Sequence, residues 1–231
     1  VQGLMLVGLA LAVILRLTSG GASFAAAGLA GGKVRYWLLG FLGFLLLYGV
    51  QAGLNALFRL GEPADTSLIL LALAGSGAAG AEQLAGLPPA IFIALMFAQT
   101  VILSPLLALL ISFGEEYGWR AYLQSEFVKL GRVRGLALVG VIWGLWHAPV
   151  ILMGYNYPGY PVAGVALMTA YCVGLAFLLG YAMLKSGSVW LAAFLHGLNN
   201  QYLAFLLSFV YRPNDMVFSF GIGLYGLPIL A

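Results

Sequence analysis

The stretch Pro88–Arg120, PPAIFIALMFAQTVILSPLLALLISFGEEYGWR, sets two neighbouring carboxylates directly behind a long apolar run. The run exceeds the roughly 20 apolar residues that a membrane-spanning helix needs. Its two leading prolines favour a helix start, whereas Pro105 predicts a kink or a break. Beyond Glu115 and Glu116 the helix is expected to continue to about Leu130. Ionisable side chains at membrane depth are costly and are usually functional, so this stretch predicts a site inside a membrane helix.

The composition of the whole chain supports this interpretation. Hydrophobic residues make up 63% of the sequence and charged residues only 7%, whereas a soluble domain carries about 25% charged residues. The apolar runs are long and continuous, unlike the short alternating segments of membrane barrels. The sequence therefore predicts an all-α, polytopic transmembrane bundle with roughly seven to eight spans. It is expected to form a single integral-membrane domain over residues 1–231.

The expected spans follow the apolar runs between polar loops. Segment 67–86 is ambiguous between a weak span, a partly inserted hairpin and an outer loop. The lone cysteine, Cys172, cannot form an intramolecular disulfide and is expected to be a small core residue. The other expected spans are Val1–Leu17, Tyr36–Phe58, the run from Pro88, Gly135–Gly154, Val162–Leu184, Val189–Tyr211 and Asp215–Ala231.

The charged loops orient these spans. The formal net charge is +3, and basic residues gather in the cytoplasmic loops of membrane proteins, which explains the charge without a nucleic-acid partner. This orientation requires that segment 67–86 adds no full crossing. The loops expected in the cytoplasm carry Lys33 and Arg35, Lys129, Arg132 and Arg134, and Lys185; the opposite side carries Arg59, Glu62, Asp65, Arg212 and Asp215.

The two glutamates are expected to have different roles. Neighbouring residues on a helix point about 100° apart, whereas Glu116 and Arg120 are four apart and share a face. We expect these two to form a buried ion pair that braces the helix. Glu115 then has no obvious local partner and is the candidate general base. The alternative is that both glutamates lie in water at a cytoplasmic helix end.

Two histidines lie in other apolar segments. His147 is expected near mid-depth in its span, with Trp143 one turn earlier on the same face. A core histidine bonded to a neighbouring helix is the alternative. His196 and Asn200 are four apart and project to one face, and their donors suit an oxyanion in acyl transfer. Helix–helix contacts also use such residues. Asn199 points elsewhere and is expected to be structural.

These residues predict a hydrolytic mechanism. Glu115, helped by His147, would activate a water molecule that attacks a peptide carbonyl, while His196 and Asn200 hold the developing negative charge. In a zinc-dependent version, His147, His196 and Glu115 would supply two nitrogens and one oxygen. The sequence lacks the His-Glu-x-x-His helix of common zinc proteases, which favours the metal-free version. No cofactor is required by this scheme.

Three motifs in this order resemble the CPBP family, which comprises type II CAAX prenyl endopeptidases and bacteriocin-processing enzymes. They are Glu-Glu-x-x-x-Arg, Phe-x-x-x-His with Trp143 in place of Phe, and His-x-x-x-Asn. The resemblance covers roughly 88–207, which it implies is the catalytic core. The sequences around the first two motifs resemble the bacterial branch. The motif residues here are Glu115, Glu116 and Arg120, then His147, then His196 and Asn200.

The resemblance implies an α-helical bundle whose site lies in a cavity within a bacterial or archaeal cell membrane. It also implies peptide-bond hydrolysis in a membrane-embedded or lipidated substrate. Members of the family have been described both as metalloproteases and as glutamate-dependent proteases. The departure at Trp143 is expected to matter little for the chemistry and to narrow the pocket beside His147.

Three other classes of protein compete with a Glu/His peptidase. A non-enzymatic immunity or scaffolding protein could keep the same residues. A proton-coupled transporter could use buried Glu and His as a relay, although Pro105 has no counterpart in an inverted half. A serine intramembrane protease could use His196 as base, with Ser76 or Ser188 as nucleophile.

Overall fold

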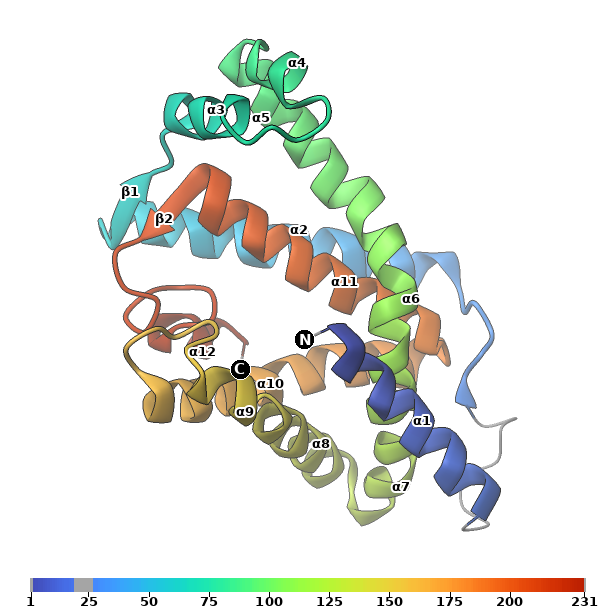
Figure 1. Cartoon of the computed structure of the whole chain (residues 1–231). Coiled ribbons are helices and arrows are strands. Elements are labelled where there is room, and N and C mark those ends of the chain that lie inside the picture. The colour runs from blue at the N-terminus through green and yellow to red at the C-terminus, as the bar shows by residue number, and fades with distance from the viewer. Residues whose placement is uncertain (1, 19–26, 231) are drawn as a thin grey trace.

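The computed structural model describes residues 2–18 and 27–230 of the chain, and nearly all of its regular structure is helical (Figure 1). A two-stranded antiparallel sheet is added to the expected all-α fold. The α-helices are α1 (Gln2–Thr18), α2 (Val34–Leu57), α3 (Thr66–Ala74), α4 (Ala81–Ala85), α5 (Pro89–Ala98), α6 (Ser104–Glu116), α7 (Gln124–Phe127), α8 (Arg132–Trp146), α9 (Ala148–Leu152), α10 (Pro161–Ser186), α11 (Val189–Phe205) and α12 (Leu227–Leu230). The π-helical turns are η2 (Gln99–Leu103), η3 (Tyr117–Leu123) and η5 (Leu206–Val210), the 3-10 turns η4 (Val128–Leu130) and η6 (Leu224–Gly226), and the strands β1 (Gly61–Pro63) and β2 (Tyr211–Pro213).

One continuous helix of 42 residues, Pro89–Leu130, carries the two glutamates. Of the kink or break expected at Pro105, the break does not occur. A π-helical turn, η2, precedes Pro105 and adds one residue to the turn where the proline lacks an N–H donor. At about 1.5 Å per residue the helix is roughly 63 Å long, well above the ~30 Å hydrocarbon core, so it must tilt strongly or project from a bilayer.

Three helices among the described residues are long and apolar enough to cross a membrane: α2, the continuous helix Pro89–Leu130, and α10. The expected number of seven to eight spans is therefore not confirmed. The helices α1, α8 and α11 are shorter, with 17, 15 and 17 residues. These findings agree with an integral membrane protein. An apolar helix of this length satisfies its backbone N–H and C=O groups with hydrogen bonds inside the helix, as the hydrocarbon of a membrane requires.

Two of the expected or ambiguous spans are not spanning helices. Segment 67–86 folds into the short helices α3 and α4, of nine and five residues, and nine residues cover only about 14 Å. The predicted span Asp215–Ala231 is wrong: its described part is a loop followed by η6 and α12. Three glycines and Pro228 interrupt this segment, and Gly221 adopts a φ of +100°, which breaks a helix.

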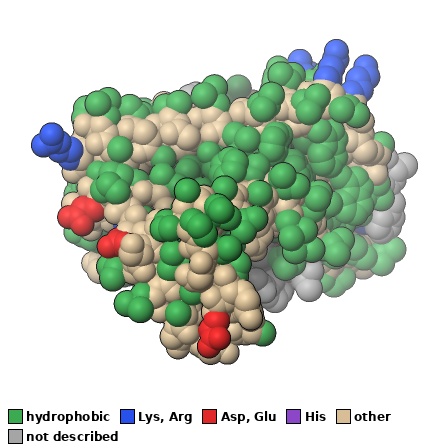
Figure 2. Space-filling view, turned by 90° about the horizontal axis from the view of Figure 1, so that it is seen from above, with side chains coloured by type: hydrophobic (Ala, Val, Ile, Leu, Met, Phe, Trp, Pro, Cys, Tyr) green, Lys and Arg blue, Asp and Glu red, His purple; other side chains and the backbone are tan. Residues whose placement is uncertain are grey.

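Charged side chains divide the bundle into two ends. The basic end carries Arg16, Lys33, Arg35, Glu126, Lys129, Arg132, Arg134 and Lys185; the acidic end carries Arg59, Glu62, Asp65, Glu82, Arg212 and Asp215. Strands β1 and β2 join α2 to α11 at the acidic end, with Glu62 opposite Arg212. At the basic end the start of α11 bonds to the residues before α2, through Val189 N and Gly28 O at 2.8 Å. Figure 2 shows a hydrophobic surface between margins that carry the charged side chains.

Two glycines on α8 bring it close to α10. A Cβ at Gly140 would lie 2.5 Å from the Cα of Val173, and a Cβ at Gly144 would lie 2.3 Å from the Cα of Thr169. Such small residues allow membrane helices to pack at close range. The contact fixes α8 just before His147, and so sets the depth of that histidine relative to α10.

Candidate active site

Glu115 on α6 is held by two indole groups. The Nε1–H groups of Trp119 and Trp143 donate to Glu115 Oε2 over 3.3 and 2.9 Å. The carboxylate is 4% exposed, and its second oxygen has no partner in the described part of the chain. Trp143 therefore does more than narrow a pocket, because phenylalanine, which the family motif has at this position, offers no N–H to Glu115.

Glu116 and Arg120 form the expected ion pair. The Arg120 Nη1 and Glu116 Oε1 atoms are 3.0 Å apart, and both side chains are 0% exposed. The same oxygen is 2.9 Å from His196 Nδ1, and the Arg120 guanidinium lies 4.4 Å from the Trp143 ring centroid. Among the described residues, Glu116 Oε2 and two Arg120 nitrogens have no hydrogen-bond partner. The pair connects the first and third motifs directly.

The sequence predicted a continuous span over Gly135–Gly154 with His147 inside it. In the structure His147 lies instead at a break between α8 and α9. Its backbone N–H bonds to Gly144 O at 3.1 Å, which leaves the carbonyl of Trp143 for His147 Nδ1 at 2.9 Å. A carbonyl only accepts, so Nδ1 carries the proton and Nε2 of the neutral ring is an acceptor. Pro149, at the start of α9, favours the break because it has no N–H.

Asn199 is buried and connects two tyrosines to Asn200. The hydroxyls of Tyr48 and Tyr171 both donate to Asn199 Oδ1, the latter over 2.8 Å. Asn199 Nδ2 donates to Asn200 Oδ1 over 2.8 Å. Because the Asn200 oxygen is occupied in this way, its Nδ2 donor is the group left for the cavity. Asn199 was expected to point elsewhere and to be structural; in the structure it lines the cavity and holds Asn200 Oδ1.

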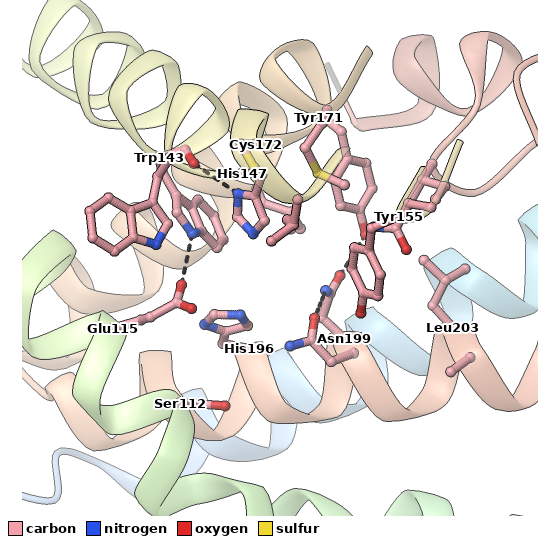
Figure 3. Close-up of a pocket in the computed structure, with 18 of the residues that line it drawn as sticks. Ser112, Glu115, Trp143, His147, Tyr155, Tyr171, Cys172, His196, Asn199 and Leu203 are labelled. Carbon is pink, nitrogen blue, oxygen red and sulfur yellow. Dashed lines mark hydrogen bonds between the residues drawn. The ribbon is translucent and has the colours of Figure 1, made fainter. Parts of the chain in front are cut away.

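One cavity of about 580 Å³ is lined by all four expected catalytic side chains, and Figure 3 shows Glu115, His147 and His196 around it. Glu115 comes from α6, His147 from the break after α8, and His196 from α11. Figure 3 also places Tyr155 and Asn199 farther along the same space. Besides Glu115, His147, His196 and Asn200, the polar lining residues are Ser112, Trp143, Trp146, Tyr155, Asn156, Tyr171, Cys172, Asn199 and Gln201.

The candidate metal ligands do not form a metal site. His147, His196 and Glu115 all line the cavity, but within residues 2–18 and 27–230 no three His, Cys, Asp or Glu side chains are grouped so that they could hold a metal ion. The candidate serines lie elsewhere: Ser188 accepts from Leu191 N at the start of α11, and Ser76 bonds to Ala78 N in an exposed turn.

Three residues of the site, Tyr48, Trp119 and Tyr171, were not predicted from the sequence. Trp119 could have been found, because it lies four residues after Glu115 on the same helix face. Tyr48 and Tyr171 have no such signal, because α2 and α10 bring them together from distant positions.

The fold and the cavity define an integral membrane protein with a polar site enclosed by apolar helices. Residues 97–202 match the family model described as "Rce1-like: Type II CAAX prenyl endopeptidase Rce1-like". This segment contains all three motifs, and the match supports the CPBP family that those motifs predict. No curated protein and no solved structure matched the chain.

Proposed function

We propose that this chain is an intramembrane endopeptidase that hydrolyses a peptide bond with water activated by Glu115 and His147. The family description names an endopeptidase. The observation that carries the proposal is that Glu115, His147, His196 and Asn200, from three separate motifs, line one cavity. Apolar helices surround this cavity, so few water molecules compete with its polar groups for the substrate.

The first step is the attack of water on the carbonyl carbon. The free oxygen of Glu115 accepts one proton of the water, and His147 Nε2 accepts a hydrogen bond from the other. The two indole donors keep the Glu115 carboxylate aimed at this water. Two oriented acceptors fix the lone pair of the water toward the substrate, which is the usual advantage of positioned general bases.

The second step distributes the negative charge and breaks the C–N bond. Asn200 Nδ2 donates to the oxyanion. As an imidazolium, His196 donates through Nε2 to the oxyanion and through Nδ1 to Glu116 Oε1. The tetrahedral intermediate then collapses, Glu115 returns its proton to the leaving nitrogen, and the products are a carboxylate and an amine. No metal takes part in this scheme.

We infer six membrane crossings in place of the seven to eight expected. These are α1, α2, the helix Pro89–Leu130, α8 with α9, α10, and α11 with η5. Their directions alternate between the two ends of the bundle. Because positively charged loops stay in the cytoplasm, we place the basic end there and the acidic end outside.

The proposed activity is tested by comparing peptide ends in membranes of host cells that carry the wild type or Glu115→Gln at equal levels. Peptide ends that appear only with the wild type, identified by mass spectrometry, support proteolysis and name substrates. The control variant is Glu126→Gln. It makes the same substitution on the same helix but near the basic end, where Glu126 pairs with Lys129, so this variant should cleave like the wild type. Identical peptide ends from all three folded proteins would instead favour a non-enzymatic immunity or scaffolding role.

A further inference from the structure

The cavity extends from the middle of the bundle toward the acidic end. On α10, which ends at the basic end, its lining runs from Met168 to Leu175 around the middle of the helix, and no residue of its last two turns lines the cavity. On α11, which starts at the basic end, the lining begins only at His196 and continues to Ala204. The loop residues that line it, Tyr155, Asn156, Met216 and Ile222, all belong to the acidic end.

Toward the basic end the cavity is closed by packed side chains. Glu116 and Arg120 lie directly behind His196 and are completely buried. One turn farther along the helix, Gln124 Nε2 donates to the carbonyl of Gly180 on α10 over 3.1 Å. Gln124 is 2% exposed. A substrate therefore has no path to Glu115 from this side without displacing the buried ion pair.

At the acidic end two loops form the mouth of the cavity. The loop before α10 is tied to the segment after β2 by Tyr157, which donates to the carbonyl of Ile222 over 2.7 Å, and by Tyr160, which donates to Asp215 over 3.0 Å. The hydrogen bond with Asp215 and the charge of that carboxylate raise the pKa of Tyr160, which keeps the phenol a donor. Tyr155, in the same loop before α10, lines the cavity and has half of its surface exposed.

Resting on the function proposed above, we propose that the substrate enters from the extracytoplasmic side and is cut in the outer half of the membrane. The mouth lies at the end with four acidic and two basic residues, whereas the opposite end carries seven basic residues and one acidic residue. That asymmetry places the mouth outside the cell. The substrate class is therefore an exported protein or peptide with an apolar, membrane-held segment, and not a lipidated C-terminus presented in the cytoplasm.

The chemistry of the mouth fits such a segment. Tyr155, Met216 and Ile222 offer apolar and aromatic surface. Besides Glu115 and the two histidines, no ionisable acid or base with a formal charge lines the cavity within the described residues. A peptide with charged side chains at the cut site would lose hydration there without gaining a partner, so we expect an uncharged segment around the scissile bond.

Sidedness is tested by thiol labelling, because Cys172 is the only cysteine of the chain. In a Cys172→Ala background, Tyr155→Cys marks the mouth and Val133→Cys marks the basic end, where Val133 is 69% exposed. We expect a membrane-impermeant maleimide to label Tyr155→Cys in intact cells or spheroplasts, and Val133→Cys only in inverted vesicles. The reverse pattern, or labelling of Tyr155→Cys from the cytoplasmic side or from neither side, overturns the proposal.

The position of the cuts supplies an independent test. The new peptide ends found with the wild type and absent with Glu115→Gln should map to the extracytoplasmic half of apolar segments in exported proteins. Cuts at cytoplasmic C-termini would overturn the proposed side of entry and leave proteolysis standing. If no new peptide ends form, the proposed function fails, whereas the labelling result still reports where the mouth lies.

Discussion

The buried ion pair between Glu116 and Arg120 is the part of the site whose removal should cost the most stability. Arg120→Met leaves the Glu116 carboxylate without its cation at a position with 0% exposure, and Glu116→Gln leaves the guanidinium unbalanced. Breaking one partner of a buried pair costs about 3–5 kcal/mol. For a chain of this size, that loss corresponds to a fall of roughly 6–20 °C in melting temperature.

The double variant shows whether Glu116 and Arg120 stabilise the protein as a pair or through two independent sets of contacts. Glu116→Gln with Arg120→Met buries no net charge, so its loss should be smaller than the sum of the single losses by at least about 1 kcal/mol. The exposed pair of Lys129 and Glu126, 2.6 Å apart with 66% and 28% of the side chains exposed, provides the control. There, Lys129→Met should change stability by less than about 1 kcal/mol.

Thermal unfolding in detergent can be followed with a thiol-reactive fluorescent dye. Cys172 is the only cysteine and is 1% exposed, so the dye reacts when the core opens. Strictly additive losses for Glu116 and Arg120, or single losses as small as that of Lys129→Met, would refute the role of the pair as a brace for the site.

Three further predictions concern catalysis by purified protein in lipid vesicles. Trp143→Phe removes one of two donors to Glu115; a hydrogen bond to a charged group contributes about 1.5–3 kcal/mol, so kcat/KM should fall roughly 10- to 150-fold, and an unchanged value would exclude this role. Either Tyr48→Phe or Tyr171→Phe leaves one hydroxyl on the Asn199 amide, so each should cost little, whereas the double change should lower kcat about 100-fold at constant KM. Strong chelators should leave activity unchanged, and restoration of lost activity by added zinc would contradict the metal-free scheme.

The tyrosine experiment has a matched control on the same helix as Asn199. Tyr202→Phe removes a hydroxyl that has no hydrogen bond within the described residues, although its ring packs on Tyr48 with centroids 6.5 Å apart. Its kcat should match that of the wild type. If Tyr202→Phe loses as much activity as the double variant, the effect reflects packing and not the orientation of Asn200.

Much of the site could be predicted from sequence because its spacing is helical. Residues four apart share a face, which places Arg120 beside Glu116. The same rule predicts that Glu115 and Trp119 meet, although only the structure directed attention to that pair. Segment 67–86 could not be assigned, because its leucines suit a membrane as well as they suit the short helix α3. The predicted span Asp215–Ala231 failed because hydropathy does not register how glycines and Pro228 interrupt a helix.

The sequence by itself determined the membrane class, the family motifs and the residues that enter the cavity, because composition and spacing along one helix are local properties. Only the tertiary structure decided what each polar atom contacts. His196 meets Glu116 across 80 residues, and Tyr48 meets Asn199 across 151 residues. The side on which the cavity opens was likewise decided by how α6, α8, α10 and α11 pack. The physical reason is that hydrogen bonds and enclosed volume depend on distances between helices, and no period in the sequence encodes those distances.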